Sequence, residues 1–153
     1  MIVPAEGPFR LDHEADTIRL GAAIGRELRR REAVCLSGPL GAGKSSLARG
    51  LIRALTGQET EAPSPTFTLV QTYETRSFPV AHFDLYRLKS ADEVAELGLD
   101  EALDDGAAVI EWPDRLGHHL PHDRLDVELA IEGERRRARL SPHGAWEDRA
   151  IEF

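Results

Sequence analysis

The stretch Gly38-Pro39-Leu40-Gly41-Ala42-Gly43-Lys44-Ser45 decides the fold of this chain. It fits every fixed position of the pattern Gly-x-x-x-x-Gly-Lys-Ser/Thr, which is typical of a phosphate-binding loop, or P-loop, between a strand and a helix. The short apolar run 33–36 precedes it, and Leu47, Leu51 and Leu55 follow it at helical spacing. The flanking sequence therefore predicts the strand and the helix that the motif requires.

Each residue type in the P-loop suits the binding of a nucleoside triphosphate with magnesium. Glycines at positions 38, 41 and 43 let successive main-chain N–H groups close around phosphate oxygens. Lys44 lies where its ammonium group reaches the β- and γ-phosphates, beside the partial positive charge of a helix N-terminus. The Ser45 hydroxyl is an oxygen ligand of the kind that Mg²⁺ prefers. The residues expected to bind the nucleotide are Gly38, Leu40, Gly41, Ala42, Gly43, Lys44, Ser45 and Ser46.

Length and composition predict one domain over residues 1–153. No apolar run is long enough to span a membrane, and the first ten residues do not resemble a secretion signal, so we expect a cytoplasmic protein without membrane contact. The formal net charge of −8 argues against direct binding to a nucleic-acid backbone, because neutralising phosphates requires a basic face. The single cysteine, Cys35, is expected in the core.

Periodicity along the rest of the chain predicts an α/β fold. Residues 9–11 are expected to form a strand, and Asp12 is expected to cap an amphipathic helix. Alternating residues at 67–74 and 80–85 predict an antiparallel hairpin.

The second half of the chain completes this architecture. Ser90 and Glu93 form a capping-box pattern that predicts a helix from Ala91. The apolar run 107–110 predicts a central parallel strand, and alternation on both sides of Gly133 predicts a second hairpin. We therefore expect a three-layer core of the P-loop NTPase type, with a mixed sheet and antiparallel hairpin additions.

Two carboxylates are candidates for the chemistry beside the loop. Glu111 directly follows the apolar run 107–110, so we expect its side chain at the carboxyl end of the sheet, where P-loop proteins order Mg²⁺. The alternative is that it only begins a turn before Pro113. Asp84 lies among apolar residues, where an unpartnered carboxylate is costly. It either has a structural partner, Arg87 or a loop amide, or helps to order water or metal.

Three other features have less specific patterns. The hydroxyl of Thr66 suits contact with a γ-phosphate and magnesium, as in switch segments, but the residue equally suits the start of a strand. The histidines within 118–122 are not expected to bind metal, because no cysteine or acidic ligand set accompanies them. The arginine runs 29–31 and 135–137 are predicted to be solvated surface.

Several segments occur in the order and spacing of the bacterial TsaE-type ATPases, and the chain resembles that family over residues 17–129. Besides the P-loop they are Ser64-Pro65-Thr66-Phe67, His82-Phe83-Asp84-Leu85-Tyr86-Arg87, Glu96-Leu97-Gly98-Leu99 and Ile110-Glu111-Trp112-Pro113. The resemblance implies an ATPase that assists threonylcarbamoyladenosine (t6A) modification of tRNA beside the anticodon. It also implies two protein partners, the subunits that transfer the threonylcarbamoyl group, and only indirect contact with tRNA.

The resemblance further implies roles for individual residues. Lys44 and the loop amides would bind ATP, with ADP as the product, and Ser45 and Glu111 would bind Mg²⁺. Trp112 would lie beside the nucleotide.

Asp84 and Thr66 would support hydrolysis or sense the γ-phosphate. The chain departs from the family pattern at two loop positions, where Pro39 replaces an acidic residue and Ser45 replaces threonine. Serine keeps the hydroxyl, so only Pro39 lacks an assigned role. The catalytic residues expected on this basis are Lys44, Thr66, Asp84 and Glu111.

Two other functions remain open on the sequence alone. A small-molecule kinase has a similar loop, and Arg135 or Arg137 could hold a phosphate acceptor, although a predicted hairpin occupies the interval where a kinase would need its lid. A non-hydrolysing switch would use ATP to order residues 57–65 for partner docking. A GTPase is not favoured, because the chain has no asparagine for the Asn-Lys-x-Asp guanine motif.

Overall fold

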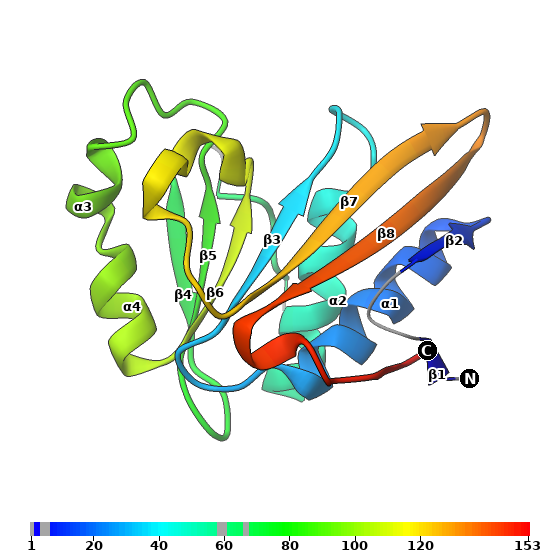
Figure 1. Ribbon diagram of the computed structural model, residues 1–153, viewed down its shortest axis with the longest axis horizontal. Coiled ribbons are helices and arrows are strands. Elements are labelled where there is room, and N and C mark those ends of the chain that lie inside the picture. The colour runs from blue at the N-terminus through cyan, green and yellow to red at the C-terminus, as the bar shows by residue number, and fades with distance from the viewer. Residues whose placement is uncertain (1, 4–6, 58–60, 66–67) are drawn as a thin grey trace.

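The computed structural model describes residues 2–3, 7–57, 61–65 and 68–153. Within them, a seven-stranded mixed sheet lies between two layers of helices (Figure 1). One face is covered by α1 (Glu14–Glu27) and α2 (Lys44–Thr56). The other is covered by α3 (Glu93–Leu97), α4 (Leu99–Asp105) and the 3-10 helix η1 (Pro113–His119). This arrangement confirms the expected three-layer α/β fold with a mixed sheet.

The strands of the sheet lie in the order β2-β8-β7-β3-β6-β5-β4. Strand β3 pairs in parallel with β6 and β7, and β6 pairs in parallel with β5. The pairs β4–β5, β7–β8 and β2–β8 are antiparallel, so both predicted hairpins are confirmed. The strand bounds are β2 (Gly7–Leu11), β3 (Ala33–Ser37), β4 (Val70–Tyr73), β5 (Val80–Asp84), β6 (Ala107–Glu111), β7 (Arg124–Glu132) and β8 (Arg135–His143).

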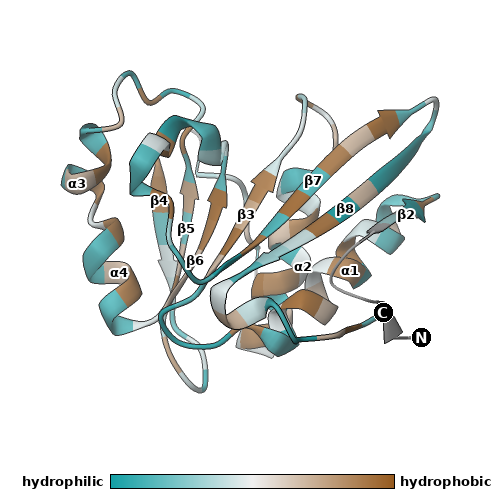
Figure 2. Cartoon of the chain, viewed as in Figure 1, coloured by the Kyte–Doolittle hydropathy of each residue, from teal (hydrophilic) through white to brown (hydrophobic). Residues whose placement is uncertain are grey.

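The central strands are continuous apolar runs because both of their faces are buried (Figure 2). Alternate side chains of β3 divide between two core layers: Val34 packs with the α1 and α2 side, and Cys35 with the α3 and α4 side. Beyond the sheet, β1 (Ile2–Val3) pairs with β9 (Ile151–Glu152), which follows the 3-10 helix η2 (Gly144–Trp146) and brings the two ends of the chain together.

Close packing of α1 against α2 fixes the helix that carries Lys44. A Cβ atom at Gly21 would lie 2.0 Å from the Leu47 carbonyl oxygen, and one at Gly50 would lie 2.1 Å from that of Ile18. Only glycine allows the two backbones to approach this closely, so the position of α2 beneath the loop is set by its contact with α1.

Several predicted boundaries are wrong. The N-cap of α1 is His13 rather than Asp12, because the Asp16 carboxylate accepts the His13 N–H at 3.0 Å while Asp12 pairs with Arg10. Helix α3 begins at Glu93 rather than Ala91, because the Ser90 hydroxyl accepts the Asp92 N–H in a turn instead of capping a helix.

Strand β4 begins at Val70 because Leu69 has a positive φ of 69°, which interrupts the predicted strand 67–74. Residues 66 and 67 lie outside the described part of the chain. Strand β5 ends at Asp84, one residue before its predicted end. Among the described helices, each is too short or too polar to cross a lipid bilayer.

Candidate nucleotide-binding site

The P-loop connects the end of β3 at Ser37 to the start of α2 at Lys44. Its path requires glycine at two points for different reasons. Gly38 has a φ of 142°, and a Cβ atom there would lie 2.3 Å from the carbonyl oxygen of Leu129 on β7. Gly41 has open space around it but adopts a φ of 83°, in the left-handed region that favours glycine. The loop therefore fits against β7 and turns its backbone toward solvent.

Lys44 lies at the mouth of this loop, nearly buried. Its Nζ atom donates hydrogen bonds to the carbonyl oxygens of Gly38 and Pro39, at 2.6 and 2.9 Å, and lies 4.2 Å from the centre of the Trp112 ring. Burial lowers the pKa of Lys44, and the charges of Glu111 and Asp84 oppose that shift. The ammonium group is thus held by neutral partners that phosphate oxygens can replace.

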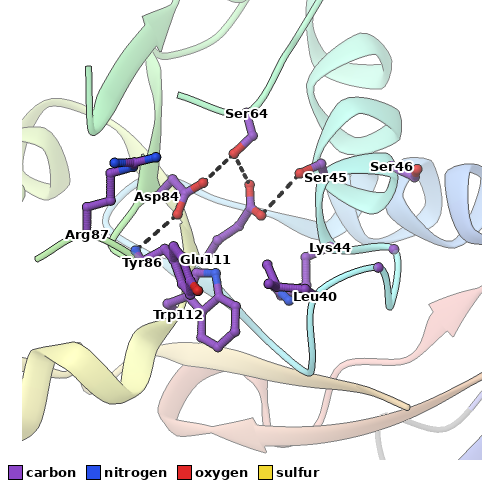
Figure 3. Close-up of a pocket in the computed structure, with 12 residues that line it drawn as sticks. Leu40, Lys44, Ser45, Ser46, Ser64, Asp84, Tyr86, Arg87, Glu111 and Trp112 are labelled. Atoms are coloured by element: carbon purple, nitrogen blue, oxygen red, sulfur yellow. Dashed lines mark hydrogen bonds between the residues drawn. The ribbon is translucent and has the colours of Figure 1, made fainter. Parts of the chain in front are cut away.

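Asp84 and Glu111 end the neighbouring strands β5 and β6, and their Cα atoms are paired across the sheet. Both side chains are buried, with 5% and 2% of the residue exposed. The Ser45 hydroxyl donates to Oε1 of Glu111 at 3.3 Å. Figure 3 shows the two acids converging with Ser45 at the foot of the loop. The structure thus brings the expected metal ligands, Ser45 and Glu111, into direct contact.

Ser64 completes what we call the acid cluster, the side chains of Ser64, Asp84 and Glu111. Its Oγ atom lies 2.5 Å from Oδ2 of Asp84 and 3.1 Å from Oε2 of Glu111 (Figure 3). A hydroxyl has one proton to donate, so it cannot satisfy both carboxylates at once. The cluster therefore gathers the oxygen atoms of two carboxylates around one hydroxyl, a donor set that suits a hard divalent cation such as Mg²⁺.

Sequence analysis missed two residues of this site. His82 lies two positions before Asp84 on β5, and its Nε2 atom is 2.6 Å from Oε2 of Glu111. The period-2 alternation of a strand places His82 and Asp84 on one face, which was an available signal. No comparable signal marks Ser64, because Thr66, two positions later, carries the same hydroxyl group. Thr66 itself lies outside the described residues.

Trp112 turns the chain sharply where β6 ends. It has a φ of 62°, and its N–H donates to the Leu36 carbonyl oxygen at 3.2 Å, so the end of β6 is joined to the end of β3. Its ring lies 4.9 Å from that of Tyr86 between ring centres. The two aromatic side chains form one wall of the site, and the Trp112 ring lies beside Lys44 of the loop.

The loop, the acid cluster and the aromatic wall enclose a cavity of about 390 Å³. A second cavity of about 320 Å³ lies on the other side of the loop, beside His13, Thr17 and Arg136. The two cavities share three lining residues, Gly41, Gly43 and Ser46. The two cavities therefore lie on either side of the residues that end the loop and begin α2.

The other residues expected to bind the nucleotide differ in their exposure and in their partners. Leu40 lies at the loop tip and is 65% exposed, whereas the Ala42 side chain is buried in the core. The Ser46 hydroxyl donates to Glu14 at 3.1 Å. Pro39 acts through its carbonyl oxygen, which accepts both Lys44 Nζ and the Ala42 N–H.

One partner of Asp84 is the loop amide that the sequence suggested, because Oδ1 accepts the Tyr86 N–H at 3.1 Å. Arg135 and Arg137 are exposed, as predicted for a solvated run. Arg136 is not wholly solvated, since it is half-buried and its Nε atom donates to the Gly41 carbonyl oxygen at 3.1 Å. The prediction for this run was therefore wrong at its middle residue, which contacts the phosphate loop.

Comparisons with known proteins show which family the sequence matches. The family model described as "Threonylcarbamoyl adenosine biosynthesis protein TsaE" matches residues 11–139. The chain is similar to the tRNA threonylcarbamoyladenosine biosynthesis protein TsaE of Rickettsia felis, with 40% identity over 127 residues that span 83% of this chain and 74% of the relative. The protein of the same name from Mycobacterium tuberculosis is 40% identical over 134 residues, covering 80% and 78% of the two chains.

A solved structure shares the fold. The crystal structure of Bacillus subtilis YdiB has a TM-score of 0.76 with this chain at 24% sequence identity, and the match covers 94% of this chain and 88% of that one.

Proposed function

Because the chain belongs to the TsaE family of threonylcarbamoyl adenosine biosynthesis proteins, we propose that it is a Mg²⁺-dependent ATP-binding protein and a weak ATPase that supports t6A modification of tRNA. It acts on a complex of two partner subunits that transfer the threonylcarbamoyl group, and the partners hold the tRNA. The net charge of −8 supports this division of labour. One observation carries the proposal: a P-loop and two buried carboxylates line the same cavity.

In this proposal the triphosphate lies along the N-terminus of α2. The N–H groups of the loop and the first helical turn bind phosphate oxygens, as helix N-termini do. Lys44 exchanges the carbonyl oxygens of Gly38 and Pro39 for phosphate oxygens, which is favoured because an ionic partner is stronger than a neutral one. The ribose and base extend past Ser46 into the second cavity, where the Arg136 guanidinium is nearby.

The donor atoms of the site fit Mg²⁺. The Ser45 hydroxyl and a Glu111 carboxylate oxygen are 3.3 Å apart, and both are hard oxygen ligands. These two residues would hold the metal, which when bound neutralises charge on the phosphate oxygens. Asp84, fixed by the Tyr86 N–H, orients a water molecule toward the terminal phosphate. Trp112 and Tyr86 cover this end of the site and limit access of other water.

A non-hydrolysing switch is the second candidate function. Ser64 lies within the predicted docking segment 57–65 and contacts both acids of the cluster, so a nucleotide bound there would also act on residues 61–65. Binding would then order a docking surface without turnover. The two functions differ in one measurable quantity, the release of phosphate.

The test begins with calorimetric titration of Mg·ATP into the full chain. Phosphate release is then measured for the chain alone, with the two partner subunits, and with tRNA added. We expect binding by the isolated chain, slow release alone and faster release in the complete mixture. Binding without release in any mixture would favour the switch, and phosphate transfer to an added nucleoside or sugar would favour a kinase.

The two lysines of the chain provide a matched control. Lys44→Gln removes the cation in the loop, while Lys89→Gln removes an exposed one outside the cavity. Only Lys44→Gln should abolish binding of Mg·ATP. Absence of any binding heat by wild-type protein, with no thermal protection by saturating Mg·ATP, would overturn the proposed function.

A further inference from the structure

His82 is a fully buried polar residue in the middle of the sheet. None of its surface is exposed, and its Nε2 atom lies 2.6 Å from Oε2 of Glu111. On the same face, apolar Val109 lies directly opposite on β6 and apolar Val80 precedes it on β5, while Gln71 lies opposite on β4 and Asp84 follows on β5. Among the described residues, the contact with Glu111 is the hydrogen bond that the imidazole makes.

The hydrogen bond fixes the direction of the imidazole ring. An ionised carboxylate only accepts hydrogen bonds, so Nε2 must carry the proton that is shared with Glu111. The other ring nitrogen, Nδ1, is buried and has no hydrogen-bond partner among the described residues. Within the described structure, the imidazole therefore acts on its surroundings through Nε2, which contacts Glu111.

The effect of Nε2 on Glu111 follows from the other contacts of that carboxylate. Ser64 approaches the same oxygen at 3.1 Å, but its hydroxyl lies closer to Asp84 and has only one proton. His82 is thus the donor that holds Oε2 in place. With Oε2 held, the second oxygen, Oε1, faces Ser45 at 3.3 Å.

We propose that His82 is a positioning residue that fixes the Glu111 carboxylate so that Oε1 and the Ser45 hydroxyl together present a preformed pair of Mg²⁺ ligands. This inference rests on the proposed function, because it assumes that these two oxygens bind the metal. Partners behind a metal ligand hold its orientation, and their loss commonly lowers metal affinity about 10- to 100-fold.

Three substitutions at one position separate positioning from packing. In His82→Gln the side-chain amide nitrogen lies as many bonds from Cβ as Nε2 does, so it can donate to Glu111. In His82→Asn the amide nitrogen corresponds to Nδ1 and falls short. His82→Leu fills the space without a donor. If the residue were merely structural, the effects would follow the thermal stability of the variants rather than the presence of a donor at Nε2.

The first readout is Mg²⁺ affinity, measured by calorimetry in the presence of a non-hydrolysable ATP analogue. We expect His82→Leu and His82→Asn to bind Mg²⁺ at least about tenfold more weakly, and His82→Gln to remain within about threefold of wild type. Affinity for the analogue without metal should not change. Wild-type Mg²⁺ affinity in His82→Leu would overturn the positioning role, as would a ranking that simply follows melting temperature.

The second readout needs neither metal nor nucleotide. Nitrogen–proton correlation spectra of the histidine rings should show His82 with its proton on Nε2, and Glu111→Ala should shift that resonance away from its hydrogen-bonded position. A proton on Nδ1 would overturn the inference. If wild-type protein binds no Mg·nucleotide, the proposed function fails and this role fails with it. If wild type binds and His82→Leu binds equally well, only the role of His82 is wrong.

Discussion

Charged groups are buried at both ends of strand β3, and the two groups have different kinds of partner. At the carboxyl end lies the acid cluster of Ser64, Asp84 and Glu111 beside Lys44. At the amino end, Glu32 directly precedes β3 and forms a bidentate ion pair with Arg149, with N–O distances of 2.7 and 2.9 Å. The acidic residues at both ends are buried, so the differences between the sites arise from the partners of these acids.

The Glu32–Arg149 pair is fully matched. Arg149 also donates to the Glu27 carbonyl oxygen at 2.8 Å and lies over the Trp146 ring, while Glu32 accepts the Arg29 N–H at 3.0 Å. The hydrogen bond to Glu32 raises the pKa of Arg149 further above its ordinary value. This pair fastens the last turn of the chain to the start of β3. It has no capacity left for a ligand.

The acid cluster has a different kind of partner. One hydroxyl proton is shared between two carboxylates, and the Nδ1 atom of His82 has no partner within the described structure. Lys44 is held by carbonyl oxygens and a ring rather than by an acid. A buried acid with a bidentate arginine partner fastens the fold, whereas two carboxylates around one hydroxyl at the edge of a cavity offer oxygen ligands to a cation. The comparison therefore assigns stability to one end of β3 and binding to the other.

The largest expected effect is on turnover, from Glu111→Ala. Loss of the carboxylate should lower the rate of ATP hydrolysis about a thousandfold, comparable to the loss of one strong electrostatic contact in a transition state. Phosphate release in saturating Mg·ATP measures this. The matched control is Glu32→Ala, which removes the other buried glutamate and should leave turnover per folded molecule unchanged. Equal turnover in the two variants would contradict the comparison.

The next largest effect is on stability, from Arg149→Met. Removing one partner of a buried pair leaves Glu32 charged and unpaired, which should lower the free energy of unfolding by about 3 kcal/mol. Urea denaturation measures the change. Arg135→Met, at an exposed arginine, serves as the control and should change stability by less than about 0.5 kcal/mol.

Mg·ATP binding at 25 °C should be the same in Arg149→Met as in wild type, since the pair lies at the far end of β3. A variant that unfolds normally but binds nucleotide more weakly would show that the two ends of the strand are coupled.

The two sites also differ in how far sequence could predict them. The P-loop, Lys44 and Ser45 are adjacent in the chain, and Glu111 follows an apolar strand, so local patterns identified them. His82 acts through a contact between neighbouring strands, and its role depends on a register that alternation alone does not give. The Glu32–Arg149 pair joins residues that are 117 positions apart, and no local pattern marks it.

The secondary structure likewise divides into elements that local sequence patterns predict and features that depend on the tertiary fold. The strands and hairpins follow from alternation and apolar runs, and α2 follows from its leucine spacing. Helix α4 was not predicted, because its seven residues, Leu99–Asp105, are mostly acidic and too few to show an apolar face clearly. Arg136 was assigned to solvent because its sequence neighbours are charged, yet the tertiary fold brings it to Gly41 on the P-loop.

A smaller effect is expected from Asp84→Asn. The amide retains an oxygen for the Tyr86 N–H but cannot accept a proton from water as a carboxylate does. We expect hydrolysis to slow about tenfold, with ATP affinity within about threefold of wild type. Rates at saturating ATP and calorimetric affinities separate the two quantities. Asp126→Asn, at a residue of β7 that lines neither cavity, is the control and should leave both quantities unchanged. A loss in affinity as large as the loss in rate would assign Asp84 to binding rather than to catalysis.

The smallest expected effect concerns Cys35, a buried ionisable group of β3 located between the two sites. Burial, followed by the charge of Asp126, raises the pKa of this thiol from 9.0 to about 12. Between those values the unfolded chain loses the thiol proton while the native chain keeps it. The native state then binds more protons, so stability must fall as pH rises, by at most about 1.4 kcal/mol per pH unit.

Cys35→Ala lacks this titration and shares every other one, so it isolates the contribution of the thiol. Urea unfolding at pH 8 and pH 10 should show wild type losing about 1 kcal/mol more than the variant over that interval. Equal losses would mean that the thiol ionises in the native state, which would require a partner or water at the middle of β3. The expected extra loss in wild type would show that the Cys35 thiol stays neutral in the native state. Along β3, charged groups would then be tolerated at the two ends, where the ion pair or the P-loop site compensates for their burial, and not in the middle.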